Sequence, residues 1–318
     1  MSDTVLILAS CTERKRLPTP KTLRLRSIRH RDARERAALW WRRLSHHRGE
    51  VVAATDLYAG GHWSVVRRLP AVAQAHGLHA TLWVISAGYG LVPASARLHT
   101  YSATFAPGHP DSVSRNGSAG GDRQVWWAEL SRRKGPDREA SRSIADLVRQ
   151  DPSTSVLIVA SAHYVDAIEP DLVRAAASLV APERLIIITT PGKMARGPLG
   201  PHVIAAQAQW QRILGGARTS LHARLAEKIL DEAAEGLRVE TVRARLERML
   251  ERSPALSQDA RQKMTDDDVR AFIRQALARD PRAAHTKLLR ALRGAGHACE
   301  QSRFKRLFFE AKARQHGN

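Results

Sequence analysis

Short, almost continuously apolar runs that alternate with helical periodicity restrict the fold of this chain more than any other feature. An apolar run without polar alternation is typical of a strand that is covered on both faces. Such runs, rich in Val, Ile and Leu, cover residues 5–10, 51–56, 81–86, 155–161 and 184–190. Helical patterns separate them over residues 31–45, 63–75, 138–150 and 164–178. This order predicts an α/β fold, an open and mostly parallel sheet with helices on both faces.

The character of the chain changes after residue 190, where Pro and Gly punctuate the sequence and helical patterns then dominate. We expect three parts: an α/β domain over 1–200, a helical extension over 201–253 and a helical DNA-binding unit over 254–318. In the last part, a helical pattern over 286–293, a Gly-Ala-Gly turn and a second pattern over 300–312 resemble a helix-turn-helix. The second helix would present Arg303, Lys305 and Arg306 to a DNA groove. An ordinary basic surface helix would have the same pattern.

The charge of the chain points to a polyanionic partner. Lys and Arg number 51 against 31 Asp and Glu, which gives a formal net charge of +20. Self-repulsion of this size destabilises a compact state, and phosphate backbones are the commonest partners that offset it. An Arg-rich genome would explain why Arg outnumbers Lys, but not why basic residues outnumber acidic ones. We therefore expect double-stranded DNA as the partner, and no membrane.

Much of this charge follows the first predicted strand. Residues 12–48 hold thirteen Lys or Arg and three acidic residues. A charge run is often only a solvated face. Here it lies beside the carboxyl end of a strand, where α/β folds bind ligands, and this favours phosphate contact. The residues expected to contact DNA are Arg14, Lys15, Arg16, Lys21, Arg24 and Arg26.

Several classes of protein are disfavoured. The two cysteines, Cys11 and Cys299, lie near opposite ends of the chain and have neither a disulfide framework nor metal-ligand spacing. No GxGxxG motif, phosphate loop or serine-hydrolase elbow is present, so we expect no metal and no cofactor. No apolar run approaches the length of a membrane span, and no signal peptide opens the chain. We expect a cytoplasmic protein.

Small, polar and aromatic residues follow the predicted strands, and in a parallel sheet these positions meet at one edge. Asp56 is the candidate catalytic residue, because one carboxylate can stabilise an oxocarbenium-like sugar and orient a water that cleaves an N-glycosidic bond. Aromatic rings and hydroxyls could hold a flipped base, under a loop formed by residues 107–121. The candidate substrate-binding residues are Ser10, Cys11, Tyr58, Ser86, Gly88, Tyr89, Tyr101, Ser161 and His163.

Each of these residues also has a structural interpretation. Asp56 could cap a helix that opens near Tyr58. Buried tyrosines commonly pack in a core and hydrogen-bond to a carbonyl. His163 could be a structural hydrogen-bond partner.

Four motifs, in this order, resemble the YaaA-like domain over about the first 190 residues: 5–11 (VLILASC) with Lys15 beyond it, 54–60 (ATDLYAG), 85–91 (ISAGYGL) and 101–105 (YSATF). That family includes peroxide-stress proteins that bind DNA. The chain is also similar to anti-phage DNA glycosylases that remove glucosylated hydroxymethylcytosine and leave abasic sites. Asp56-Leu57-Tyr58 resembles the Asp-Pro-Tyr of uracil-DNA glycosylases, whose Asp positions water, although Leu57 replaces the Pro. Their His-Pro-Ser loop is absent unless residues 161–163 (SAH) stand in for it.

Together, the residues and the resemblance lead to one hypothesis and two alternatives. The hypothesis is a DNA N-glycosylase that removes a modified base from phage DNA, with glucosylated hydroxymethylcytosine as the base that the resemblance implies. One alternative is a non-enzymatic DNA-binding stress protein of the YaaA type. The other is an enzyme that modifies bases in RNA.

Overall fold

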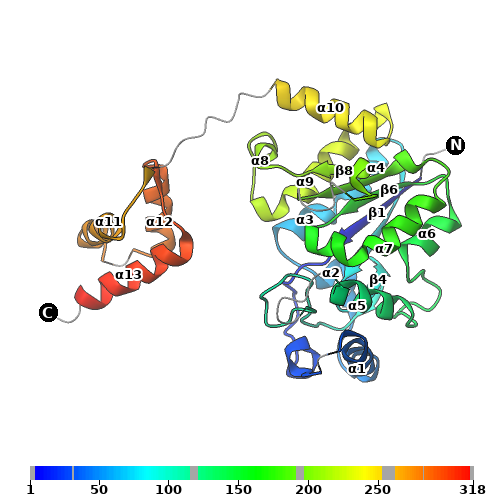
Figure 1. Cartoon of the computed structure of the whole chain (residues 1–318), viewed down its shortest axis with the longest axis horizontal. Coiled ribbons are helices and arrows are strands. Elements are labelled where there is room, and N and C mark those ends of the chain that lie inside the picture. Colours follow the sequence, from blue (N-terminus) through cyan, green and yellow to red (C-terminus); the bar gives the residue numbers. More distant parts are fainter. Residues whose placement is uncertain are drawn as a thin grey trace. The chain divides into compact units, whose positions relative to one another are not determined.

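The computed structural model describes residues 4–30, 32–114, 121–190, 197–252, 262–281 and 283–315. The chain divides into two compact units, Met1–Ser253 and Pro254–Asn318, which are treated separately below (Figure 1). Residues 201–253 therefore belong to the first unit. Part of the loop expected to close the site, residues 115–120, lies outside the described residues.

The first unit is built on a six-stranded sheet with the order β4-β3-β1-β6-β7-β8. All neighbouring strands are parallel except β4, which runs antiparallel to β3. Every residue of β6 and β7 is buried, as the unbroken apolar runs predict. The expected α/β class with a mostly parallel sheet is confirmed. The strands are β1 (Thr4–Ser10), β3 (His79–Ser86), β4 (Gly90–Pro93), β6 (Ser155–Val159), β7 (Leu185–Thr189) and β8 (Val203–Ala205).

Helices cover the sheet in two layers. The helices α3 and α4 each contact α9, and α4 and α9 contact the sheet. The helices α1, α5, α6 and α7 form a second connected group, in which α7 contacts β7 (Figure 1). Their bounds are α1 (Ala33–His46), α3 (Gly61–Val66), α4 (Leu69–Ala75), α5 (Gly121–Ser131), α6 (Ile144–Gln150), α7 (Ala162–Ser178), α8 (Ala208–Leu214), α9 (Leu221–Asp231) and α10 (Val239–Glu251).

The predicted strand over 51–56 is wrong. Only β2 (Val52–Ala53) is extended, and it pairs with β5 (Arg97–Leu98) in a separate two-stranded ribbon. The chain then turns into the single helical turn α2 (Ala54–Leu57). The apolar run here is short and only half-buried, so it lacks the two-sided cover that a central strand requires.

Other differences from the expected elements have local causes. The helix predicted over 63–75 is divided into α3 and α4, with Pro70 in the first turn of α4, where its missing N–H costs no hydrogen bond. The helix predicted over 138–150 begins only at Ile144, because the Ser143 side chain accepts a hydrogen bond from the Asp146 amide and caps it there. Strands β4 and β8 were not predicted, since each is too short to show periodicity.

The second unit has a core of its own, formed by residues that include Val269, Ile273, Leu292, Phe304 and Leu307. Its elements are β9 (Gln262–Lys263), α11 (Asp266–Arg279), α12 (His285–Gly294), β10 (His297–Ala298) and α13 (Gln301–Gln315). Within the described residues of both units, no helix is long and apolar enough to cross a membrane.

Candidate functional site

The strand order places a topological switch point between β1 and β6. Counted along the chain, the parallel strands β1, β3, β6, β7 and β8 are arranged 2-1-3-4-5, so the connections leave β1 and β6 in opposite directions. Doubly wound sheets bind ligands outside the carboxyl ends of the strands at this switch point. Ser10 and Cys11 end β1 there, and Ser161 precedes α7 after β6. The buried Cys11 thiol lies 3.3 Å from the Tyr164 hydroxyl and joins the two sides.

Three side chains form a hydroxyl cluster at the carboxyl end of β3: Tyr58, Ser86 and Tyr101. The Tyr101 hydroxyl is 2.7 Å from Ser86 Oγ and 3.0 Å from the Tyr58 hydroxyl. The Ser86 Oγ also accepts the backbone N–H groups of Gly88 and Tyr89, at 3.2 and 2.9 Å. The sequence thus named three residues that the fold brings into direct contact.

The tyrosines of this site are neutral at ordinary pH. Burial raises the pKa of Tyr58, Tyr101 and Tyr164 well above the usual value, and it also raises the pKa of Tyr89. A neutral phenol can donate or accept a hydrogen bond but is a poor base. These hydroxyls can therefore form hydrogen bonds without acting as bases.

Gly88 and Tyr89 have supporting positions. A Cβ added at Gly88 would lie 2.4 Å from Tyr101 Cε2, so the absence of a side chain at residue 88 lets the tyrosine ring lie against the backbone. The Tyr89 hydroxyl accepts the His99 backbone N–H at 3.0 Å and lies 3.3 Å from the His99 carbonyl. Its hydroxyl therefore fixes the loop after β5.

Lys15 joins this site, although the sequence suggested only a phosphate contact for it. Its ammonium lies 4.2 Å from the centre of the Tyr101 ring and 5.6 Å from that of Tyr58. Its Nζ donates to the carbonyls of Thr12 and Glu13, at 3.2 and 3.3 Å. Burial lowers the pKa of Lys15, against the opposing effect of nearby acidic groups.

Asp56 lies apart from the hydroxyl cluster in its contacts. Its side chain is 54% exposed and pairs with Arg67 at 3.5 Å. Within the described residues, no hydrogen bond joins its carboxylate to Tyr58, Ser86 or Tyr101. Asp56 lies in the first turn of α2, whose N-cap is Ala53, so its side chain is not the cap of that helix.

Ser161 and His163 lie at the start of α7. Ser161 is the N-cap residue but makes no side-chain cap hydrogen bond, and no acidic residue lies in the first turn. Partial desolvation, aided by the charge of Arg123, lowers the pKa of the largely exposed His163. This end of α7 therefore favours negative charge in a ligand.

Sequence reasoning missed two histidines on the other side of β1. Burial, and then proximity to His222, lowers the pKa of His62 to about 4, so its ring is neutral. The buried Nε2 of His62 has no hydrogen-bond partner among the described residues. Thr190 Oγ1 lies 3.1 Å from His222 Nε2. Single histidines separated by 160 residues carry no spacing signal, so only the fold could pair them.

No metal centre is apparent in this part of the molecule. Across the ranges that the structure describes, no group of three or more His, Cys, Asp or Glu side chains could hold a metal ion. The side chains at and after the ends of β1 and β3 offer hydroxyls, a thiol and an amine, which suit hydrogen bonding and covalent chemistry.

The predicted DNA-contacting residues after β1 fall into two groups. The side chains of Arg14, Arg16 and Lys21 are exposed, and none has an ion-pair or hydrogen-bond partner among the described residues. Arg26 instead makes a bidentate ion pair with Asp111, at 2.6 Å for the shorter contact, and the carboxylate is fully buried. Arg24 donates to the Thr19 carbonyl at 3.2 Å. Arg26 therefore joins the segment after β1 to the segment that holds Asp111, and its guanidinium is bound within the protein.

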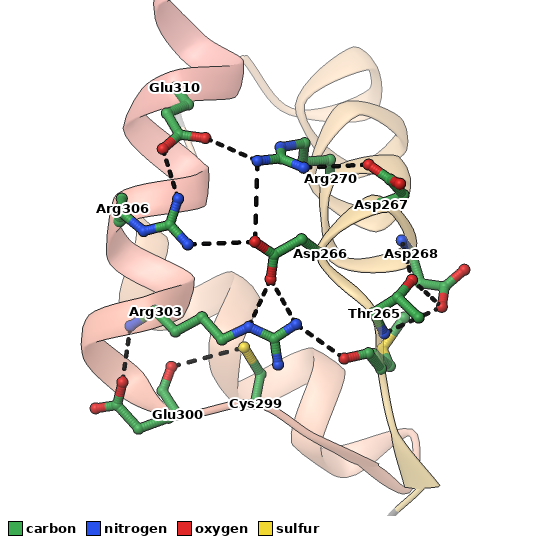
Figure 2. Close-up of polar contacts among 11 residues, drawn as sticks. Thr265, Asp266, Asp267, Asp268, Arg270, Cys299, Glu300, Arg303, Arg306 and Glu310 are labelled. Carbon is green, nitrogen blue, oxygen red and sulfur yellow. Dashed lines mark hydrogen bonds and ion pairs between the residues drawn. The ribbon is translucent and has the colours of Figure 1, made fainter.

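Two arginines of α13, Arg303 and Arg306, also form ion pairs with carboxylates of the second unit (Figure 2). Arg303 Nε donates to Asp266 at 2.7 Å, and Arg306 reaches the other oxygen of Asp266 at 3.2 Å. Arg306 also bonds Glu310 at 2.8 Å. Lys305 is exposed on the same helix. Of the three residues predicted to read DNA here, two hold α13 against α11.

No family model matches this chain, and neither the curated proteins nor the solved structures include a significant match. The similarity to the YaaA-like domain therefore rests on the motifs quoted above. All four motifs contribute residues to the site at the strand ends: Cys11 from 5–11, Tyr58 from 54–60, Ser86 from 85–91 and Tyr101 from 101–105.

Proposed function

We propose that this protein is a DNA N-glycosylase that removes a modified base, in defence against phage. One observation carries the proposal: the hydroxyl cluster and Lys15 lie together at the carboxyl ends of the parallel strands. The segment that holds Lys15 also carries three exposed basic residues, Arg14, Arg16 and Lys21. Phosphates bound by that segment would lie next to groups that can hold a base. We further propose that the chain is a YaaA-like protein.

In this proposal the target base leaves the stack and enters the strand-end site. Tyr58, Ser86 and Tyr101 are buried and their hydroxyls bond one another, so the base would have to displace these contacts to reach the donors and acceptors near Lys15. The ammonium of Lys15 would stabilise negative charge that develops on the leaving base. The first turn of α7, which has no side-chain cap, would attract a phosphate.

Asp56 is the proposed water-activating residue, and this role requires its Arg67 ion pair to open, since the carboxylate is now paired at 3.5 Å. An exposed pair of this kind is weak, so substrate binding could open it. Asp56→Asn should retain DNA binding and lose base release, because an amide cannot orient and deprotonate water as a carboxylate does.

The test uses the full chain and three DNA substrates: phage DNA with glucosylated hydroxymethylcytosine, the same DNA without the sugar, and unmodified DNA. Released bases are identified by mass spectrometry, and abasic sites are labelled with an aldehyde-reactive probe. We expect a free modified base and one abasic site for each base released. Intact DNA from every substrate, at protein concentrations that saturate binding, would refute the glycosylase.

A second candidate is a DNA-binding protein without enzymatic activity. The observation that favours it is the exposure of Asp56, because no carboxylate in the described part of the chain hydrogen-bonds to the hydroxyl cluster. This candidate predicts binding without base release and no effect of Asp56→Asn. Competition among duplex DNA, single-stranded DNA and tRNA would also reveal an enzyme that acts on RNA.

A further inference from the structure

Lys15 has a backbone position that is unusually well defined for a residue in a basic loop. It forms a β-bridge with Tyr58, and the adjacent backbone bonds are Arg16 N–H to Leu57 O and Ala59 N–H to Arg14 O, each 2.9 Å. Two segments about 40 residues apart in the chain are thus joined at Lys15. Its amine is held at a set place, which an ordinary solvated lysine is not.

The amine is also held in a way that permits loss of a proton. Among the described residues, its hydrogen-bond acceptors are the carbonyls of Thr12 and Glu13. A neutral amine has two hydrogens, so it can keep both bonds and still present a lone pair. Burial favours the neutral form, as the lowered pKa indicates. A lysine in this condition is a nucleophile toward carbonyl carbon.

The surroundings of Lys15 suit a sugar more than a small metabolite. The rings of Tyr101 and Tyr58 flank the amine at 4.2 and 5.6 Å, and exposed Arg14 and Arg16 precede and follow it in the chain. A deoxyribose without its base carries an aldehyde at C1′ in its open form, with a phosphate on either side. The amine of Lys15 would meet this aldehyde, and the guanidinium groups of Arg14 and Arg16 would meet the phosphates on its two sides.

We propose that Lys15 attacks C1′ of an abasic deoxyribose, forms a Schiff base and cleaves the strand. This inference rests on the proposed function, which supplies the abasic site. A bond forms between Nζ and C1′, and the C1′ oxygen leaves as water. A proton then passes from C2′ to water, and a double bond forms between C2′ and C3′. The bond between C3′ and its oxygen breaks, and the 3′ phosphate leaves with the electron pair of that bond. Addition of water to the imine releases Lys15.

The experiment begins after base removal, so it does not depend on which base is recognised. The full chain is mixed with a duplex oligonucleotide that carries one abasic site, in the presence of sodium cyanoborohydride, which reduces an imine to a stable amine. We expect a covalent protein–DNA adduct, and peptide mass spectrometry should place it on Lys15. Without the reductant, the strand should be cut on the 3′ side of the abasic site.

Two variants provide the comparison. Lys15→Arg keeps a cation over the tyrosine rings but is not nucleophilic, and it should lose the adduct. Lys134→Arg changes an exposed lysine outside the basic segment that holds Lys15 and should keep it. Thermal unfolding of both variants checks that they fold, and mapping of the wild-type adduct decides the matter even if Lys15→Arg is unstable.

Each outcome bears on one proposal. An adduct on a different lysine, or none from abasic DNA, overturns the role of Lys15 even if the protein releases bases from phage DNA. An adduct on Lys15 without release of any base from phage DNA supports this inference and refutes the proposed glycosylase.

Discussion

At the scale of single residues, the absence of a side chain at Gly88 makes room for the Tyr101 ring of the hydroxyl cluster. The Tyr101 ring occupies the space that a Cβ would fill, and that ring carries the hydroxyl that bonds Ser86 and Tyr58. The ring is 1% exposed, so it has no free volume into which it could move. Glycine here is a packing requirement, since its backbone does not need a positive φ.

Gly88→Ala should therefore destabilise the first unit by about 1–3 kcal/mol, the usual cost of overpacking a core. Gly61→Ala is the matched control, because a Cβ at that position meets nothing within 4 Å. We expect the control to change stability by less than about 0.5 kcal/mol. Urea unfolding monitored by tryptophan fluorescence measures both. Equal stability of the two variants would contradict the packing argument.

At the scale of single elements, α13 is held by carboxylates at its start and along one side. Glu300 accepts the backbone N–H groups of Ser302 and Arg303, each at 2.9 Å, which satisfies amides that a helix start leaves open. The hydrogen bond from the Ser302 side chain, with these amides, lowers the pKa of Glu300 to about 2. Asp266 then receives both Arg303 and Arg306 from α13 (Figure 2).

The lowered pKa of Glu300 predicts a pH dependence of α13. A carboxylate whose pKa is lower in the folded state stabilises that state above the unfolded pKa, and the effect is lost as the pH falls. Here the loss should run from about pH 4.5 down to about pH 2. Amide hydrogen exchange in α13, corrected for the intrinsic rate, should accelerate across this range. Glu300→Gln should reduce this acceleration, because residue 300 then has no charge to lose, whereas Glu247→Gln, at an exposed position of α10, should leave it unchanged.

Asp266 and its neighbour Asp267 allow a second comparison on the same turn of α11. Asp266 pairs with Arg303 and Arg306 of α13, whereas Asp267 is 93% exposed and pairs with Arg270 of its own helix. Asp266→Asn should thus speed amide exchange in α13 more than Asp267→Asn does. Similar exchange in both variants would show that the network does not hold α13 in place.

At the scale of the whole molecule, the formal net charge does not tell how many basic side chains can bind another molecule. The formal charge is +20, and basic residues outnumber acidic ones in both units. Yet Arg26, Arg303 and Arg306, three of the nine residues predicted to contact DNA, are bound to carboxylates of the protein. In the proposed complex with DNA, the arginines without such partners, such as Arg14 and Arg16, are the ones that would release counterions.

Salt dependence of DNA binding separates these two kinds of arginine. Arg14→Ala should weaken binding to any duplex and reduce the slope of log K against log salt by about 1, the contribution of one phosphate contact. Arg26→Ala should leave the slope unchanged and lower the stability of the first unit, because the buried Asp111 carboxylate loses its bidentate partner. The slope is measured by fluorescence anisotropy at several salt concentrations. If Arg26→Ala reduced the slope and Arg14→Ala did not, Arg26 would be the arginine that contacts phosphate and the assignment would be reversed.

The sequence by itself determined the α/β class, four of the sheet's six strands and the residues that end them. Continuous apolar runs signal two-sided burial wherever they are long enough, and they failed at 51–56, where the run is short and half-buried. Only the tertiary structure decided which polar residues act together. It joined Lys15 to Tyr58 and Tyr101, left Asp56 exposed beside Arg67, and paired Arg26 and Arg303 with carboxylates. These contacts span up to 86 residues of chain, and local periodicity carries no information about such distances.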